Sequence, residues 1–353
     1  MNKQKILALL AAAVLLMSCL GLSGCADSNR DKTVVVFTYG DYNDPGIFKD
    51  FEKATGYTCR VDTFRTPEDM YNKLTAGGGD YDVVCVSDYI LERMIADNRM
   101  LKIDFDNVPE YKNIMTSCLE QSKSFDPTLE YTVPYFWGVI GILYNKTMVD
   151  ESKMNSWEVL RDPEYKNEII MFDSYRDLYS IPLMQLGYSL NTTDRAQLDK
   201  AQQWLKEQAP LVSAYMVDEA RDEMVGNRAA MATIWSGEAQ GCIDSNPNLA
   251  FTVPDKGANL WLDSWAIPDT AMNKKGAEAF INYMCGVEAS EKNFDYIAYP
   301  TPNQVLYDSF DSEVKNNPNI FIPQETLEKC EVFKWLDAET LAYYESLFKK
   351  LKG

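Results

Sequence analysis

The 353-residue chain contains no histidine. Histidine supplies the most common general base and the most common metal ligand in proteins, so its absence excludes the usual form of both kinds of site. The sequence also lacks the Gly-x-Ser-x-Gly motif that presents a nucleophilic serine in one large class of hydrolases. Paired carboxylates are the hydrolytic chemistry that remains. A hydrolase that uses such a pair is therefore kept as a less favoured alternative.

Basic residues are also scarce. Lys and Arg number 34 against 53 Asp and Glu, which gives a formal net charge of −19. Such a surface repels nucleic acid and anionic lipid, and it attracts cations. The charge also serves solubility, so by itself it only favours a cationic ligand. Aromatic residues are plentiful, with 21 Tyr and 7 Trp, and they are compatible with an aromatic-lined binding site.

The first residues have the pattern of an export signal. MNKQK carries two lysines, an apolar stretch runs from Ile6 to Leu22, and small residues precede Cys25. The sequence LSGC at 22–25 resembles the bacterial lipobox, in which cleavage before the cysteine leaves its thiol to be lipidated. We therefore expect a lipoprotein signal peptide at 1–24, lipidation of Cys25 and a polar tether at 25–32. A plain signal peptide or a short membrane anchor is the alternative.

The eight cysteines have no Cys-x-x-Cys spacing, so a zinc or redox motif has no support. Cys19 leaves with the signal peptide, and Cys25 is assigned to the lipid. Cys85 and Cys285 lie in apolar runs and are expected in the core. The sequence does not pair the six cysteines of the mature chain.

Strands and helices alternate through the first part of the mature chain. Apolar, β-rich runs predict strands at 33–42, 57–64 and 81–89. Helical patterns lie between them, one ended by Gly56 and the next begun by Thr66 with Pro67 at its first position. This alternation is typical of an α/β fold with a wound parallel sheet.

Two long extended segments then interrupt the alternation. The apolar run Tyr131–Val149 has no helical pattern and is too long for one ordinary strand, and Asn259–Pro268 is extended again. Strands that cross between two lobes would account for both segments. We expect a first lobe of 33–137 plus 264–306 and a second lobe of 138–263 plus 307–353.

Polar and aromatic residues follow the ends of four predicted strands. They are Tyr39, Asp41 and Tyr42 after the first strand, Ser87 and Tyr89 after the third, Ser174 and Asp177 after a strand at 168–172, and Trp235 in the run 228–239, expected to be a strand that ends in a loop. Ligands of wound α/β sheets bind beyond the carboxyl ends of the strands. These residues therefore predict a shared pocket.

The chemistry of these residues indicates a class of ligand. Indole and phenol faces attract cations, worth about 0.5–2 kcal/mol per contact, and carboxylates bind ammonium groups through charge-assisted hydrogen bonds. Methylene groups pack on the same rings. A linear alkyl polyamine meets all three demands. A sugar needs no set of carboxylates, and an anionic ligand calls for arginines, of which the four strand ends named above hold only Arg176.

Several segments resemble the spermidine/putrescine-binding proteins of bacterial polyamine ABC importers, in the same order over nearly all of the mature chain. They are FTYGDYNDPGIFKDFEKATGYTCRVDTF, YDVVCVSDY, YTVPYFWG, IWSGEA, LWLDSWAIP and YPTPN. The resemblance implies a two-lobed periplasmic-binding-protein fold of the α/β class. Two crossover strands would join the lobes, and the ligand would be held in the cleft between them.

The segment NLWLDSWAIP places Asp263 between two tryptophans, where a bare carboxylate is costly. Trp261 and Asp263 match the family's Trp-x-Asp, whose carboxylate binds an amine of the ligand. The resemblance assigns only these two residues to the ligand. We therefore expect the chain to bend near Ser264 and to turn Trp265 into the first lobe.

Other residues take their roles from the same resemblance. Tyr299 of YPTPN matches a cleft aromatic, and Asp177 matches an acidic position at the other end of the ligand. Ser174 replaces an Asp found in some members. Near the C-terminus, Phe333 or Lys334 stands where some members have a Gln that contacts an amine.

The sequence thus predicts a lipid-anchored extracytoplasmic receptor, in the periplasm or on the cell surface, that binds putrescine or spermidine and delivers it to an ABC transporter permease. We expect a monomer with no cofactor, no metal and no nucleic-acid partner. A solute-binding protein for a sugar or a thiamine-like cation is the main alternative.

The lipid anchor is tested by Cys25→Ala. Lipoprotein signal peptidase should leave this precursor uncleaved, and the protein should carry no acyl label, because the thiol that accepts the lipid is gone. Normal acylation of the variant would contradict the assignment.

Overall fold

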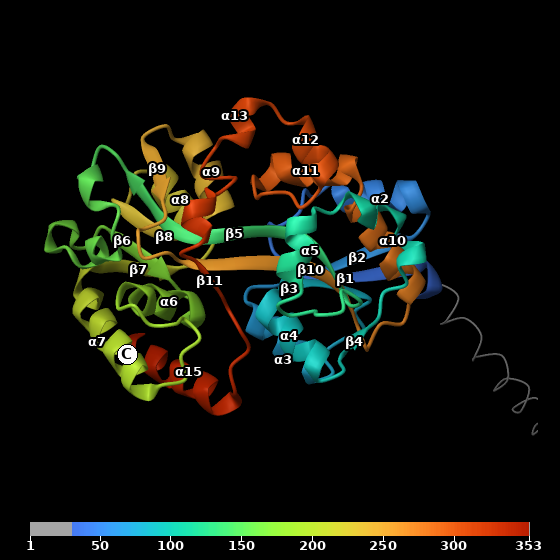
Figure 1. Ribbon diagram of the computed structural model, residues 1–353, viewed down its shortest axis with the longest axis horizontal. Helices are drawn as coiled ribbons and strands as arrows, with labels where there is room; N and C mark the ends of the chain where they lie inside the picture. The colour runs from blue at the N-terminus through green and yellow to red at the C-terminus, as the bar shows by residue number, and fades with distance from the viewer. Residues whose placement is uncertain (1–29, 353) are drawn as a thin grey trace, which may run out of the picture.

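The computed structural model describes residues 30–352, whose eleven strands form one curled, hydrogen-bonded sheet (Figure 1). Eight of these strands follow one another in a continuous path, and the other three pair beside it. The order along the path is β2-β1-β3-β10-β5-β8-β6-β7, with β4 and β11 paired to β10 and β9 paired to β5. The strands are β1 (Thr33–Tyr39), β2 (Thr58–Phe64), β3 (Val83–Ser87), β4 (Met100–Leu101), β5 (Thr132–Asn145), β6 (Ile169–Phe172), β7 (Val212–Met216), β8 (Met231–Trp235), β9 (Leu249–Thr252), β10 (Asn259–Pro268) and β11 (Glu331–Val332).

Helices pack around this sheet. The α-helices are α2 (Ile47–Thr55), α3 (Pro67–Thr75), α4 (Asp88–Ala96), α5 (Thr116–Ser122), α6 (Tyr175–Gln185), α7 (Arg195–Gln208), α8 (Ala220–Val225), α9 (Ser236–Ser245), α10 (Lys274–Met284), α11 (Val287–Ile297), α12 (Gln304–Ser309), α13 (Ser312–Lys315), α14 (Gln324–Leu327) and α15 (Ala338–Lys352). Short 3-10 helices are η1 (Arg30–Lys32), η2 (Phe105–Asn107), η3 (Pro109–Asn113), η4 (Glu151–Lys153), η5 (Trp157–Arg161), η6 (Pro163–Tyr165) and η7 (Ala209–Leu211).

Parallel strands form the centre of each half of the molecule. β1 pairs in parallel with β2 and β3, and β6 pairs in parallel with β7 and β8. The apolar run from Val34 to Phe37 is fully buried, as expected for a strand covered on both faces. The α/β class predicted from the sequence is confirmed.

β5 and β10 connect the two halves. The first part of β5 pairs with β10 from Thr132 to Val139, and its second part pairs with β8 from Ile140 to Tyr144. Figure 1 shows both strands running across the middle of the molecule, between a lobe built on β1–β3 and a lobe built on β6–β8. The two-lobed fold with two crossing strands is therefore confirmed. The exact lobe boundaries stay a prediction.

β5 carries a bulge opposite Asp263. The β5 partners of Leu262 and Ser264 lie three residues apart rather than two, so the extra residue is in β5, whereas Asp263 keeps its regular pairing with β3. Beyond the bulge Trp265 is buried against Tyr135 and Phe280, with ring centroids 5.0 and 5.1 Å apart. The expected turn of Trp265 into the first lobe is confirmed.

Two predicted helix boundaries are also confirmed. α2 ends at Gly56, which has a φ of 78° that favours glycine. α3 begins after Thr66, whose hydroxyl accepts a hydrogen bond from the backbone N–H of Asp69, and Pro67 occupies the first helical position. β2 therefore lies between a helix end at Gly56 and a helix start at Thr66.

The prediction of a loop after Trp235 is wrong. β8 passes directly into α9, which begins at Ser236 with Trp235 as its N-cap residue. Ser and Gly are weak helix formers in isolation, but tertiary packing overrides their propensity here. As a result, the side chain of Glu238 belongs to a helix rather than to a loop.

The C-terminal segment divides between the lobes. Phe294 of α11 packs with Leu306 and Ile320, whereas Tyr344 and Leu347 of α15 pack in the core of the second lobe. Residues up to Ile320 therefore lie with a helix of the first lobe. We propose that the boundary expected after 306 falls after residue 322 instead.

The globular body already begins within the predicted tether. Arg30 in η1 donates a 2.7 Å hydrogen bond to the buried carboxylate of Asp82, which also accepts the backbone N–H of Val35. The predicted signal peptide, Cys25 and the tether up to residue 29 lie outside the described residues. Within residues 30–352, no helix is both long enough and apolar enough to cross a membrane.

Candidate functional site

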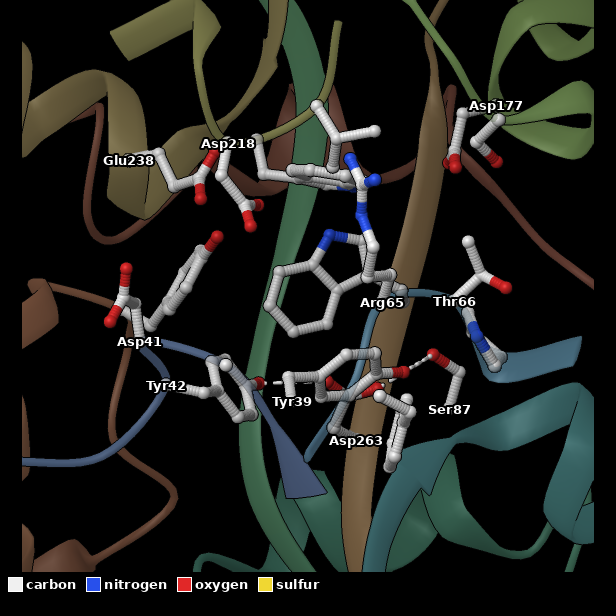
Figure 2. A pocket seen from close by; sticks show the side chains of 18 of the residues that line it. Tyr39, Asp41, Tyr42, Arg65, Thr66, Ser87, Asp177, Asp218, Glu238 and Asp263 are labelled. Atoms are coloured by element: carbon white, nitrogen blue, oxygen red, sulfur yellow. Dashed lines mark hydrogen bonds between the residues drawn. The ribbon is translucent and has the colours of Figure 1, made fainter. Parts of the chain in front are cut away.

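A cavity of about 220 Å³ lies between the two lobes (Figure 2). All eleven side chains that the sequence predicts for the site contribute to its lining: Tyr39, Asp41, Tyr42, Ser87, Tyr89, Ser174, Asp177, Trp235, Trp261, Asp263 and Tyr299. The expectation that these residues share one pocket is therefore confirmed. Their contact with a ligand stays a prediction.

Strand ends place most of these side chains. Tyr39 ends β1, Ser87 ends β3 and Trp235 ends β8, and Ser174 follows β6 by two residues. Because the strands within each lobe are parallel, their carboxyl ends meet at one edge of that lobe's sheet. The two edges face each other across the cavity, so residues far apart in the sequence converge there.

Asp263 lies at the floor of the cavity and is 4% exposed. Its Oδ2 accepts a 2.8 Å hydrogen bond from the Tyr42 hydroxyl, and its Oδ1 accepts a 2.7 Å bond from the Ser87 hydroxyl. The Tyr39 and Ser87 hydroxyls lie 2.9 Å apart, so Tyr39 donates in turn to Ser87. Figure 2 shows this chain of hydroxyls leading to the carboxylate.

The charge of Asp263 has no cationic partner within residues 30–352. Among the described residues, no Lys or Arg nitrogen lies within 4.0 Å of this carboxylate. Burial raises the pKa of Asp263 to about 6, although the hydrogen bonds from Ser87 and Tyr42 act in the opposite direction. A cation that entered the cavity would complete the environment of this carboxylate.

Aromatic rings form the walls beside Asp263. The rings of Trp261 and Tyr299 meet edge to face with centroids 5.0 Å apart, and Tyr42 meets Tyr299 at 5.8 Å. Gly237 makes this wall feasible, because a Cβ there would lie 2.2 Å from the Tyr299 ring. The indole N–H of Trp261 has no hydrogen-bond partner.

A second acidic region surrounds Asp177. Burial raises the pKa of Asp177 to about 6, and the nearby Ser174 side chain lowers it in part. Glu68 of α3, which the sequence did not suggest, accepts a 2.8 Å hydrogen bond from the Tyr89 hydroxyl. The Arg176 guanidinium lies 5.5 Å from the centre of the Tyr89 ring. Tyr89 therefore connects the lining of the cavity to this group of charges.

A third acidic region lies at the opposite side of the cavity, where Figure 2 shows Asp41, Asp218 and Glu238 together. The Glu238 side chain is 8% exposed, and its Oε2 has no hydrogen-bond partner. Burial raises the pKa of Glu238 to about 8, while the guanidinium of Arg221 lowers it in part. The sequence did not suggest Glu238, Asp218 or Arg221.

Phe333, and not Lys334, lies in the lining of the cavity. The ring of Phe333 meets that of Tyr89 edge to face at 5.7 Å. The backbone N–H of Lys334 donates to the Asn191 side chain instead. No lysine at this position opposes a cation in the cavity.

The site does not have the form of a metal centre. Within residues 30–352, no group of three or more Cys, Asp or Glu side chains is arranged to hold a metal ion. The six cysteines of this part of the chain are free, and Cys85 and Cys285 are buried as the sequence predicts.

Comparison with known proteins agrees with this geometry. The family model for bacterial extracellular solute-binding proteins matches residues 46–322. The chain is 33% identical over 348 residues to a spermidine/putrescine-binding periplasmic protein of Salmonella typhimurium, which covers 98% of this chain and 97% of that protein. This chain belongs to the bacterial extracellular solute-binding proteins.

Further relatives are also polyamine-binding proteins by name. The solute-binding protein is 32% identical over 346 residues to a spermidine/putrescine-binding periplasmic protein of Escherichia coli K12, covering 98% and 97% of the two chains. It also resembles the structure of a spermidine/putrescine ABC transporter substrate-binding protein of Streptococcus pneumoniae, with 35% identity, a TM-score of 0.78 and coverage of 91% and 98%. The resemblance recognised in the sequence is confirmed, and the protein is a binding protein rather than an enzyme.

Asp263→Asn measures the cost of the buried charge in the empty protein. Burial raises the pKa of Asp263 from 3.8 to about 6 in the folded state. The resulting penalty is nearly absent at about pH 3, where the carboxyl group is mostly neutral in both states, and is fully present above about pH 7, where it is ionised in both. As pH rises from about 3 to about 7.5, the wild type should lose up to about 3 kcal/mol of stability relative to the variant.

Urea unfolding of both proteins at the two pH values checks this. Asp106→Asn, which changes an exposed carboxylate outside the cavity, is the matched control and should keep the pH dependence of the wild type because it retains Asp263. A stability difference between wild type and Asp263→Asn that does not change with pH would contradict the assigned burial cost.

Proposed function

We propose that the solute-binding protein captures a linear polyamine, putrescine or spermidine, in the cavity between its lobes. The observation that carries the proposal is Asp263, a carboxylate that is 4% exposed and bound only by two hydroxyl groups. An ammonium or secondary amine placed against it supplies the missing cation. Exclusion of water on binding strengthens that pairing, because the effective dielectric around the two charges falls.

The remainder of the cavity suits the rest of such a ligand. Trp261, Tyr299 and Trp235 offer faces for cations and for methylene groups, the latter worth about 0.8 kcal/mol per buried CH₂. Asp177 provides an anchor for a second ammonium group at the far side of the cavity from Asp41 and Glu238. A sugar would use the rings but would leave these carboxylates unpaired.

The relatives support the same assignment. The proteins of Salmonella typhimurium and Escherichia coli that match nearly the full length of the chain are named for spermidine and putrescine binding. We propose that the protein delivers the ligand to the permease of an ABC transporter as a monomer. We also propose that lipid on Cys25 anchors it to the membrane on the extracytoplasmic side.

Isothermal titration calorimetry with putrescine, spermidine, a maltodextrin and thiamine tests the proposal. Putrescine or spermidine should bind, and the other two solutes should not. Asp263→Asn should lose roughly 2–5 kcal/mol of polyamine binding, the range found when a buried charge pair loses one partner. Asp177→Asn should produce a separate loss, because a linear polyamine is anchored at both ends.

Asp106→Asn again serves as the control, since it removes one surface charge without touching the cavity. Binding of thiamine or the maltodextrin with no heat from either polyamine would refute the proposed ligand. Wild-type polyamine affinity in Asp263→Asn would refute the role of that carboxylate.

A further inference from the structure

Arg221 of α8 contributes a cation to the third acidic region. Its Nη2 lies 3.5 Å from Oδ2 of Asp41, and its Nη1 lies 3.9 Å from Oε1 of Glu238. Its Nε donates a 3.2 Å hydrogen bond to the backbone carbonyl of Asp218. The guanidinium thus lies between a carboxylate that follows β1 in the first lobe and one on α9 in the second lobe.

The carboxylates that face Arg221 are not fully satisfied by it. Glu238 is nine-tenths buried, and its second oxygen, Oε2, has no partner. Asp41 keeps 68% of its side chain exposed and adopts a φ of 48°, a backbone conformation that Asp tolerates better than most residues. The two acids are therefore able to accept a further cation, which would have to approach the guanidinium.

We propose that Arg221 is a specificity-determining residue that holds the third acidic region as a resident cation and so disfavours ligands with a third ammonium group. This inference rests on the proposed polyamine function. A diamine places its two charges at Asp263 and Asp177 and leaves Arg221 undisturbed. A triamine brings a third charge toward Asp41 and Glu238, where it meets like charge well within the screening length of about 8 Å.

Arg228 offers a control for this effect. It follows α8 in the second lobe, and its Nε lies 2.9 Å from Oε2 of Glu223. Its side chain is 54% exposed, and Arg228 does not line the cavity. Loss of Arg228 therefore removes one positive charge near α8 without freeing a carboxylate of the cavity such as Glu238.

The test compares spermidine with putrescine by titration calorimetry in wild type, Arg221→Gln, Arg221→Lys and Arg228→Gln. Arg221→Gln should raise the ratio of spermidine to putrescine affinity by roughly five- to tenfold, because Asp41 and Glu238 become available to the third ammonium group. Arg221→Lys keeps the positive charge and should stay within about twofold of the wild-type ratio. Arg228→Gln should leave the ratio unchanged.

Three results would overturn the inference. A parallel fall of both affinities in Arg221→Gln would make Arg221 a closure contact only. An unchanged ratio in Arg221→Gln would remove its role in specificity. A rise of the ratio in Arg221→Lys as large as in Arg221→Gln would exclude an effect of the positive charge. Arg221 is 29% exposed on the surface of α8, and thermal unfolding will verify that its variants fold. Failure of wild type to bind either polyamine would instead refute the proposed function.

Discussion

The carboxylate of Asp263, buried without a cation of its own, is the constraint around which the cavity is arranged. It lies on β10 between the two lobes, paired with Ser87 of β3 and facing a bulge in β5. Isolated burial of a charge costs several kcal/mol unless hydrogen bonds and an opposite charge compensate for it. Two hydroxyl groups, from Tyr42 and Ser87, provide the hydrogen bonds. Under the proposed function, the ligand supplies the opposite charge.

This arrangement couples ligand binding to the two-lobed architecture. Tyr42 and Ser87 belong to the first lobe, whereas Trp235 and Glu238 belong to the second, so the walls of the cavity come from both. β5 and β10 hold the lobes in one hydrogen-bonded sheet while the cavity separates their strand ends. A ligand that spans the cavity would therefore contact residues of both lobes.

The sequence was informative where the backbone obeys simple rules. Parallel strands bring their carboxyl ends together, so Tyr39, Ser87, Ser174 and Trp235 were predictable from their positions after apolar runs. Asp263 was conspicuous because a charge between two tryptophans has no local compensation. The packing of Trp265 away from the cavity was expected from the family resemblance, which assigns only Trp261 and Asp263 to the ligand.

Several charged residues in or beside the cavity escaped sequence reasoning, whereas Tyr89 and Asp177, which also lie on helices, were found from their places just after strands. Glu238 lies in the first turn of α9, which begins directly after β8 where the weak helix formers Ser236 and Gly237 had suggested a loop. Gly237 is there because the Tyr299 ring packs against it, a contact between residues 62 positions apart that local pattern does not reveal. Arg221 and Glu68 likewise lie on helices whose approach to the cavity depends on tertiary packing.

Proton release on ligand binding tests the role of Asp263 most directly. Titration calorimetry near pH 6, in buffers with different enthalpies of ionisation, gives the number of protons released when the polyamine binds. Because the pKa of Asp263 is about 6 in the empty protein, roughly half of this carboxyl is protonated there, and pairing with an ammonium group should expel that proton. Asp263→Asn should release roughly half a proton less than wild type. Equal proton release by the two proteins would show that no cation pairs with Asp263.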